Sequence, residues 1–158
     1  MANERSTQDT NSSNNQIQLV IFKLAGEEFG IDIMQVQEII RLPALTRIPQ
    51  APGYVKGIIN LRGKIIVVMN LGARFGMDSK DFDDNSRIII VKIDETVVGM
   101  IVDSVSEVIR IPAKNIESAP NRITSKVHAD YLHGVGVVGQ RLLILLDMEK
   151  VLVEEETL

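Results

Sequence analysis

From Ile17 onward, the chain alternates between short apolar runs and clusters of turn residues. Ile and Val together number 38, so most of these runs are rich in β-branched residues. A side chain branched at Cβ is stiff at χ1 and packs well on a pleated surface, and the pattern therefore predicts strands. Many short strands separated by Gly, Pro and Asn predict an all-β barrel or sandwich. The runs are IQLVIFKL, EEFGIDI, GIINLRGKIIVVMNL, SRIIIVKI, TVVGMIVDSV, GVGVV and RLLILL.

Apolar residues at helical spacing occur only in short segments. Both ends of the chain are predicted to be tails. Residues 1–15 are polar and almost devoid of large apolar groups, which predicts a disordered N-terminal tail. Residues 154–158 form a second, shorter tail. The segments with helical spacing are about Met34–Ile40, Leu71–Gly76, Ser125–Tyr131 and Met148–Val153.

An internal repeat organises the chain between these tails. Shifting the sequence by 69 positions lays residues 18–43 over residues 87–112 with eight identities, where ordinary residue frequencies give about one or two. Farther on the shift becomes 77, because the segment 113–130 is longer in the second copy by about eight residues. At that shift Tyr54 and Gly57 align with Tyr131 and Gly134. The eight identical pairs are Ile21/Ile90, Lys23/Lys92, Gly30/Gly99, Val36/Val105, Glu38/Glu107, Ile40/Ile109, Arg41/Arg110 and Pro43/Pro112.

The repeat predicts one domain over residues 16–153, built as a pseudo-twofold pair of small barrels. We expect the first barrel repeat at about 17–76, a linker at 77–85 and the second barrel repeat at about 86–153. A unit of this size is close to the limit at which a single core is stable, so the two barrels should share an apolar interface. The repeat leaves open whether strands are exchanged between the barrels.

Composition excludes several kinds of chemistry. The chain has no Cys, which removes disulfides, thiolate nucleophiles, iron–sulfur clusters and Cys-based zinc sites. Two His cannot build a three-histidine metal site, and we expect no cofactor. No apolar run reaches eighteen residues and the N-terminal stretch is not a signal peptide, so we expect a cytoplasmic protein without direct membrane insertion.

Two motifs with catalytic associations fit a structural interpretation better. Gly134–Gly139 spells GxGxxG, but it lies in an apolar run that leads into another strand rather than into a helix. Its glycines are typical of a bulge or a barrel corner. Ser125, His128 and Asp130 lie within six residues of one loop, whereas nucleophilic triads assemble from distant segments.

The distribution of charge suggests a binding surface. The net charge is −4, yet no Asp or Glu occurs between Ile39 and Met77, a stretch that carries six cations. Such a concentration of positive charge can steer and orient an acidic partner. Arg62 stands at the tip of an expected hairpin, where Gly63 would supply a positive φ and the turn itself does not require a guanidinium. The six cations are Arg41, Arg47, Lys56, Arg62, Lys64 and Arg74.

Several of these motifs together resemble the CheW family, the coupling proteins of bacterial chemotaxis. The resemblance runs from about Ile17 to Val153. It is carried by the segments FGIDI (29–33), VQEI (36–39), YVKGIINLRG (54–63), GMIVDSV (99–105), YLHG (131–134) and LILLD (143–147).

The resemblance implies two SH3-like five-stranded β-barrels without a catalytic site. It implies an adaptor that links the cytoplasmic tips of methyl-accepting chemotaxis receptors to the regulatory domain of the histidine kinase CheA. Such a protein is recruited to receptor arrays at the membrane. Carried over by motif, the receptor-binding residues are Val36, Glu38, Gly57, Arg62 and Gly63, and the adjacent Lys56 and Lys64 would support them.

Two other hypotheses stay open at the level of the sequence. One is a nucleotide-dependent enzyme that uses Gly134–Gly139, and the other is a nucleic-acid-binding double barrel that uses the basic stretch. The pI of about 5.2 and the aromatic content of 4% count against the second. We therefore expect no nucleic-acid partner.

Overall fold

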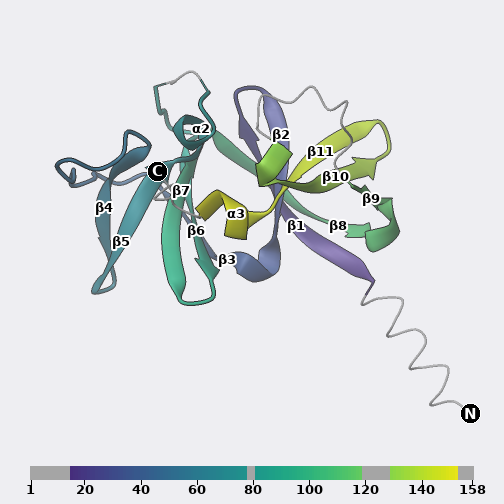
Figure 1. Ribbon diagram of the computed structural model, residues 1–158, viewed down its shortest axis with the longest axis horizontal. Coiled ribbons are helices and arrows are strands. Elements are labelled where there is room, and N and C mark those ends of the chain that lie inside the picture. Colours follow the sequence, from purple (N-terminus) through teal and green to yellow (C-terminus); the bar gives the residue numbers. More distant parts are fainter. Residues whose placement is uncertain (1–14, 78–80, 119–128, 153–158) are drawn as a thin grey trace, which may run out of the picture.

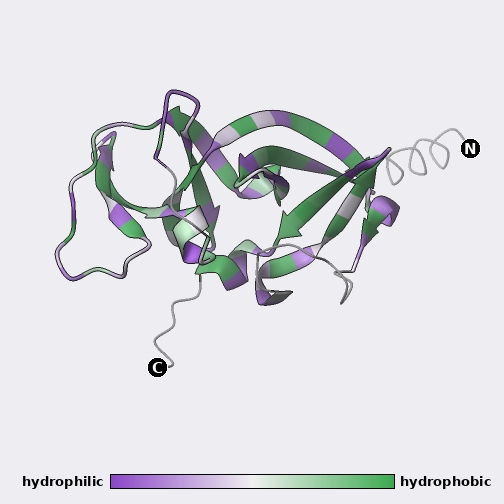
Figure 2. Ribbon diagram, turned by 90° about the horizontal axis from the view of Figure 1, so that it is seen from above, coloured by the Kyte–Doolittle hydropathy of each residue, from purple (hydrophilic) through white to green (hydrophobic). Residues whose placement is uncertain are grey.

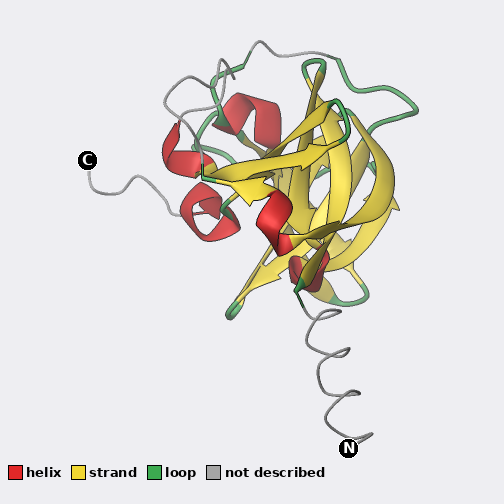
Figure 3. Cartoon of the chain, turned by 90° about the vertical axis from the view of Figure 1, so that its right-hand side faces the viewer, coloured by secondary structure: helices red, strands yellow, loops and turns green. Residues whose placement is uncertain are grey.

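The computed structural model of the protein describes residues 15–77, 81–118 and 129–152, and strands dominate these ranges. They form two sheets, each curled into a lobe, and the two lobes lie side by side (Figure 1). Figure 3 shows the strands wrapping around the lobe that faces the viewer, with the short helices at its margin. The structure thus confirms the predicted all-β pair of barrels.

Each barrel is one sheet of mixed antiparallel and parallel pairs. The sheet of the first barrel runs in the order β3 (Val36–Arg41), β6 (Arg87–Ile93), β7 (Thr96–Val102), β5 (Lys64–Asn70) and β4 (Val55–Leu61). The sheet of the second barrel runs in the order β8 (Ser104–Pro112), β1 (Gln16–Leu24), β2 (Glu27–Asp32), β11 (Arg141–Leu146), β10 (Leu132–Val138) and the two-residue β9 (Ile116–Glu117). The helical turns are η1 (Ile33–Gln35), α2 (Leu71–Arg74), η2 (Ala113–Asn115), η3 (Ala129–Tyr131) and α3 (Met148–Leu152).

The barrels do not coincide with the sequence repeats. The hairpin β1–β2 belongs to the first repeat but pairs with β8 and β11 of the second barrel, and β6–β7 is exchanged in the opposite direction. The boundaries at about 17–76 and 86–153 therefore delimit the sequence repeats and not the barrels, and the exchange that the repeat left open does occur. Equivalent strands carry the same alternation of apolar residues, so the sequence pattern fits either pairing. The tertiary structure decides between them.

The two sheets are nevertheless equivalent strand for strand. In the repeat, β1, β2, β3, β4 and β5 correspond to β6, β7, β8, β10 and β11, and their order across the two sheets is the same. The parallel contact at Val68↔Gly99 in the first barrel recurs at Leu145↔Gly30 in the second. Each barrel closes where the chain after β3 or β8 returns to β4 or β10, through the Thr46↔Ile58 bridge and through β9.

Three apolar clusters hold the molecule together. One fills each barrel, and a third and larger one lies between the two sheets, with Phe22 and Phe29 from the second barrel facing Ile89 and Met100 from the first. Figure 2 shows that hydrophobic residues dominate the strands of both barrels. The third cluster is the shared apolar interface that the small size of each unit requires.

Arg74 is buried beside this interface, where α2 lies against α3. Its guanidinium carbon lies 4.9 Å from the ring centroid of Tyr54 and 5.2 Å from that of Tyr131, two residues that are equivalent in the repeat. Nε donates a hydrogen bond to the carbonyl of Val151 and Nη1 donates one to the hydroxyl of Tyr131. Arg74 therefore links α2 to α3 and does not belong to the exposed basic surface expected from the sequence.

The short helices agree only in part with the predicted ones. α2 and α3 occupy the predicted segments at Leu71–Gly76 and Met148–Val153. Over Met34–Ile40 the prediction is wrong, because η1 ends at Gln35 and a strand follows. The apolar residues of this segment imitate helical spacing, but β3 alternates between half-buried and exposed residues, with a one-residue bulge between Val36 and Glu38.

Several expectations fall on parts of the chain outside the described residues. These parts are 1–14, 78–80, 119–128 and 153–158. They hold nearly all of the predicted N-terminal tail, the short C-terminal tail, three residues of the linker, and Ser125 and His128.

Candidate protein-binding site

Arg62 occupies the exposed tip of the hairpin that joins β4 to β5. Both turn residues have positive φ, +52° at Arg62 and +86° at Gly63, as a tight two-residue turn requires. The amide of Gly63 donates a hydrogen bond to Oδ1 of Asn60, which fixes the start of the turn. A positive φ is unfavourable for a residue with a side chain, and Asn and Gly are the usual occupants of such turns. Turn geometry thus explains Gly63 but not Arg62.

The guanidinium of Arg62 is held by Glu38 of β3. Nη2 donates to both carboxylate oxygens, at 2.9 Å to Oε1 and 2.8 Å to Oε2. The Arg62 side chain is 73% exposed, whereas that of Glu38 is 26% exposed. The hydrogen bond that Arg62 donates to Glu38 is the main cause that raises the pKa of Arg62 above its usual value. The fold brings together two residues 24 positions apart that the sequence placed on the same surface only by resemblance.

Gly57 shapes the site through the backbone. Its φ is +154°, and a Cβ added there would lie 2.3 Å from the carbonyl oxygen of Thr46. The amide of Thr46 donates to the carbonyl of Ile58, and the amide of Ile58 donates back to Thr46. The chain after β3 must approach β4 this closely to close the first barrel, which only glycine allows. Gly57 therefore acts through the fold of the site and offers no side chain for contact.

Val36 is half-buried at the start of β3. It packs against the apolar cluster between the sheets, and its repeat equivalent Val105 packs against the same cluster. Val36 is thus placed next to the inter-barrel junction, two positions before Glu38, with only part of its side chain available to a partner.

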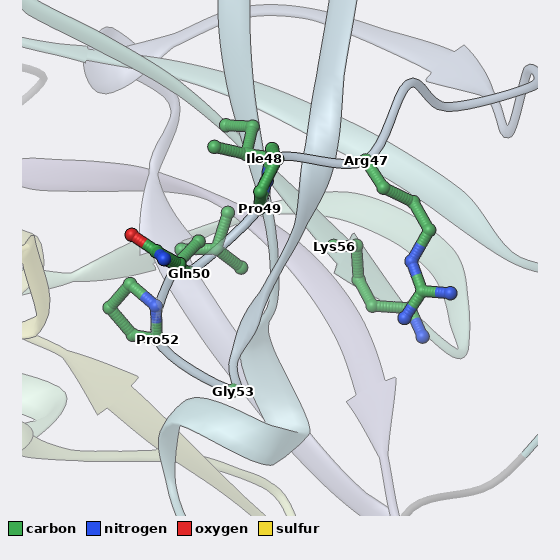
Figure 4. A pocket seen from close by; sticks show the side chains of 9 residues that line it. Arg47, Ile48, Pro49, Gln50, Pro52, Gly53 and Lys56 are labelled. Atoms are coloured by element: carbon green, nitrogen blue, oxygen red, sulfur yellow. The ribbon is translucent and has the colours of Figure 1, made fainter.

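Exposed cations surround this hairpin in the sequence and lie on the surface of the first barrel. Arg41, Arg47, Lys56 and Lys64 are all exposed. Arg47 and Lys56 line one open hollow of about 420 Å³, formed by the loop 47–53 and the start of β4 (Figure 4). The ammonium of Lys56 also lies 5.6 Å from the ring centroid of Phe82. Five of the six cations expected at a binding surface are accessible there, and the buried Arg74 is the exception.

Comparison with known proteins decides the family. The model of the CheW-like domain matches residues 18–156. The chain belongs to the CheW-like domain family. It is 40% identical over 139 residues to the chemotaxis protein CheW of Klebsiella aerogenes, covering 88% of this chain and 83% of that protein. It is 37% identical over 145 residues to CheW of Treponema pallidum, with 89% and 85% covered.

A solved structure agrees with this assignment. The crystal structure of the scaffolding protein TtCheW from Thermoanaerobacter tengcongensis superimposes with a TM-score of 0.82 and 37% identity. The match covers 88% of this chain and 94% of that one. CheW-family proteins are non-catalytic scaffolds, so the chain is a chemotaxis adaptor and not an enzyme.

In this CheW-family chain the GxGxxG motif is part of a strand and its turn. Gly134 and Gly136 lie in β10, and a Cβ at Gly134 would lie 2.5 Å from the carbonyl oxygen of Glu117. Gly139 has a φ of +59° in the turn to β11. The same closure of the barrel that requires Gly57 requires Gly134, its repeat equivalent. The motif does not open a helix, as a dinucleotide site demands.

Sequence reasoning missed a set of exposed apolar side chains. Ile39, which its spacing assigns to the core, is 37% exposed, and Ile65 is 63% exposed. Their repeat equivalents in the second barrel, Val108 and Leu142, are 47% and 65% exposed. The repeat holds the signal that could have revealed these exposed residues, because both copies carry an aliphatic residue at each of the two outward-facing strand positions.

Among the helices of the described ranges, none is long and apolar enough to cross a membrane. Within the same ranges, no three acidic or His side chains cluster closely enough to hold a metal ion.

Proposed function

We propose that the chain couples methyl-accepting chemotaxis receptors to the histidine kinase CheA. The observation that carries the proposal is the exposed Arg62 guanidinium, which its own Glu38 holds on the surface of a CheW-family barrel. The protein acts in the cytoplasm and is recruited to receptor arrays at the membrane. Its two partners are the cytoplasmic tip of the receptor and the regulatory domain of CheA.

Glu38 and Arg62 form the polar part of the receptor-binding surface. Because Nη2 of Arg62 serves both oxygens of Glu38, the pair presents a fixed donor to an incoming acidic or carbonyl group. Lys56 and Lys64 add a positive field that orients the partner during approach. Val36 contributes apolar contact at the junction, while Gly57 and Gly63 set the backbone on which this surface depends.

The regulatory domain of CheA is bound through barrel-to-barrel contacts at other faces. Each barrel exposes aliphatic side chains at the same two repeat positions, Ile39 and Ile65 in the first and Val108 and Leu142 in the second. Two similar but unequal faces on one molecule allow head-to-tail contacts, which can close into rings.

The test measures the affinity of the chain for each of the two partners separately. Arg62→Ala should weaken binding of a receptor cytoplasmic fragment by about fivefold or more, because it removes the oriented donor and leaves Glu38 unpaired. The affinity for the CheA regulatory domain and the melting temperature should stay unchanged, since the side chain is exposed. Lys92→Ala, an exposed lysine of β6, is the matched control.

Equal receptor affinity for Arg62→Ala and the parent protein would remove Arg62 from the receptor site. Failure of the parent protein to bind either partner would overturn the coupling function itself. Both affinities can be measured by isothermal titration calorimetry.

A further inference from the structure

The second barrel contains a hollow that the proposed receptor surface does not use. It has a volume of about 350 Å³ and lies between β1, β2, β11 and the start of α3. Its apolar lining includes Ile17, Leu19 and Leu145, of which Leu19 and Leu145 also belong to the core of this barrel. His133 at the start of β10 forms part of its wall. The hollow thus borders buried core side chains of the second barrel.

In the first barrel, an aromatic side chain lies at the equivalent place. The repeat equivalents of Leu19, Leu145 and His133 are Ile88, Val68 and Lys56. Phe82, from the linker before β6, packs against the cluster that contains Ile88 and Val68, and Lys56 lies over its ring. Phe82 is half-buried there and covers the core of the first barrel.

The second barrel receives no such aromatic from the corresponding segment. The residue 69 positions before Phe82 is Ser13, and residues 1–15 contain no Phe, Tyr or Trp. Among the described residues, none that lines the hollow is aromatic. A site that one barrel fills with its own side chain is therefore left open by the described residues of the other.

The rim of the open hollow is acidic, which identifies the chemistry of its occupant. Asp32, Asp147 and Glu149 line the hollow, and Glu149 is exposed. Asp32 and Asp147 accept hydrogen bonds from the backbone amides of Met34 and Lys150, which fix the two carboxylates beside the hollow. In the first barrel the three equivalent residues are Ile101, Asn70 and Gly72, which carry no charge.

We propose that this hollow binds a partner protein through one aromatic or large aliphatic side chain flanked by lysine or arginine. The apolar side chain takes the place that Phe82 occupies in the first barrel, and the flanking cations face Asp32, Asp147 and Glu149. Burying an apolar side chain supplies affinity, and opposite charges at the rim select the segment that carries it. The site is separate from Arg62, so the proposal does not depend on the coupling function.

The experiment uses the full-length chain and a fluorescently labelled nine-residue peptide with a central phenylalanine between two lysines on each side. In one control peptide alanine replaces the phenylalanine, and in the other glutamates replace the lysines. Fluorescence anisotropy should show binding of the first peptide at least about tenfold tighter than binding of either control. In an NMR titration, the amide shifts should concentrate on Gly30, Ile31 and Leu145.

Two variants locate the site. Glu149→Lys should weaken peptide binding at least about fivefold, whereas Glu95→Lys, the same charge change in an exposed turn of the first barrel, should leave it unchanged. His133→Trp fills the hollow with a large side chain of the protein itself. In this variant the peptide should no longer shift the amide signals of Gly30, Ile31 and Leu145.

Equal affinity for the three peptides, or shifts centred on the basic loop 47–53, would overturn the proposal. The amide shifts at the hollow could also change with protein concentration when no peptide is present. That result would show that a second copy of the chain occupies the hollow, and it would contradict the proposal as well.

Discussion

At the scale of single residues, the positions most sensitive to change are glycines at which two backbones meet. Gly57 and Gly134 are equivalent in the repeat, and each leaves less than 3 Å between a virtual Cβ and a carbonyl oxygen, that of Thr46 or of Glu117. A backbone carbonyl cannot move aside without breaking the closure of its barrel. The recurrence of glycine at this position therefore has a structural cause that is independent of any partner.

Gly57→Ala should destabilise the whole protein. The added methyl group would collide with the carbonyl of Thr46 and a φ of +154° would be strained, so we expect a loss of about 3 kcal/mol or more in the free energy of unfolding. Gly26→Ala is the control, since Gly26 has a φ of +82° but open space around it, and should cost about 1 kcal/mol. Urea denaturation of both variants measures the difference, and equal losses would show that steric contact is unimportant.

At this same scale, the ion pair of Arg62 and Glu38 could not be derived from sequence spacing. The hairpin, its turn and the exposure of Arg62 follow from local pattern and glycine chemistry, and the structure confirms them. The carboxylate that Arg62 contacts lies 24 residues away on a different strand. Only the curvature of the first barrel brings the tip of β4–β5 to β3.

At the scale of elements, the linker between the repeats has a structural role as well as a connecting one. Phe82 packs against the core of the first barrel, and Ser86, which directly follows the linker, is buried. The hydroxyl of Ser86 accepts a hydrogen bond from the amide of Asp83, and the carboxylate of Asp83 accepts one from Asn85. These bonds fix the linker so that Phe82 is held over the barrel.

Phe82→Ala should therefore open in the first barrel the hollow that is already open in the second. For a half-buried phenylalanine we expect a loss of about 1–3 kcal/mol in the free energy of unfolding. Asp81→Ala, an exposed neighbour, should have no measurable effect. Thermal denaturation followed by circular dichroism measures both, and an unchanged midpoint for Phe82→Ala would contradict the covering role.

Elements also show where sequence patterns mislead. Most strands follow from runs of β-branched residues, and their equivalence follows from the repeat. The segment Met34–Ile40 fails because it forms a strand in which Val36, Glu38 and Ile40 are half-buried and Ile39, between them, is exposed. Which face of β3 is covered depends on its place in the sheet beside β6, which no local propensity encodes.

At the scale of the whole molecule, the exchange of hairpins makes the two repeats interdependent. β1–β2 completes the second barrel and β6–β7 completes the first, so neither repeat contains all the strands of one barrel. Arg74, between Tyr54 and Tyr131, adds a contact that also requires both repeats. We infer that the molecule folds as one cooperative unit.

Two fragments, 1–80 and 81–158, test this interdependence. Each should be unfolded alone at low micromolar concentration, because the edges of its strands and half of the central apolar cluster would be exposed. Mixing the two should restore the dispersed NMR spectrum of the intact chain. Sedimentation checks that neither fragment folds by dimerising, and a monomeric fragment with a dispersed spectrum would contradict the prediction.

The sequence by itself determined the all-β class, the repeat, the family resemblance and the exposed hairpin tip. These features depend on local alternation, glycine chemistry and recurrence along the chain, all of which a sequence displays directly. Only the tertiary structure decided the exchange of hairpins, the burial of Arg74, the pairing of Arg62 with Glu38 and the unequal hollows of the two barrels. Each of these depends on contacts between segments far apart in the sequence, and for the hairpins the repeat also makes the alternative partners alike, so only packing in three dimensions decides them.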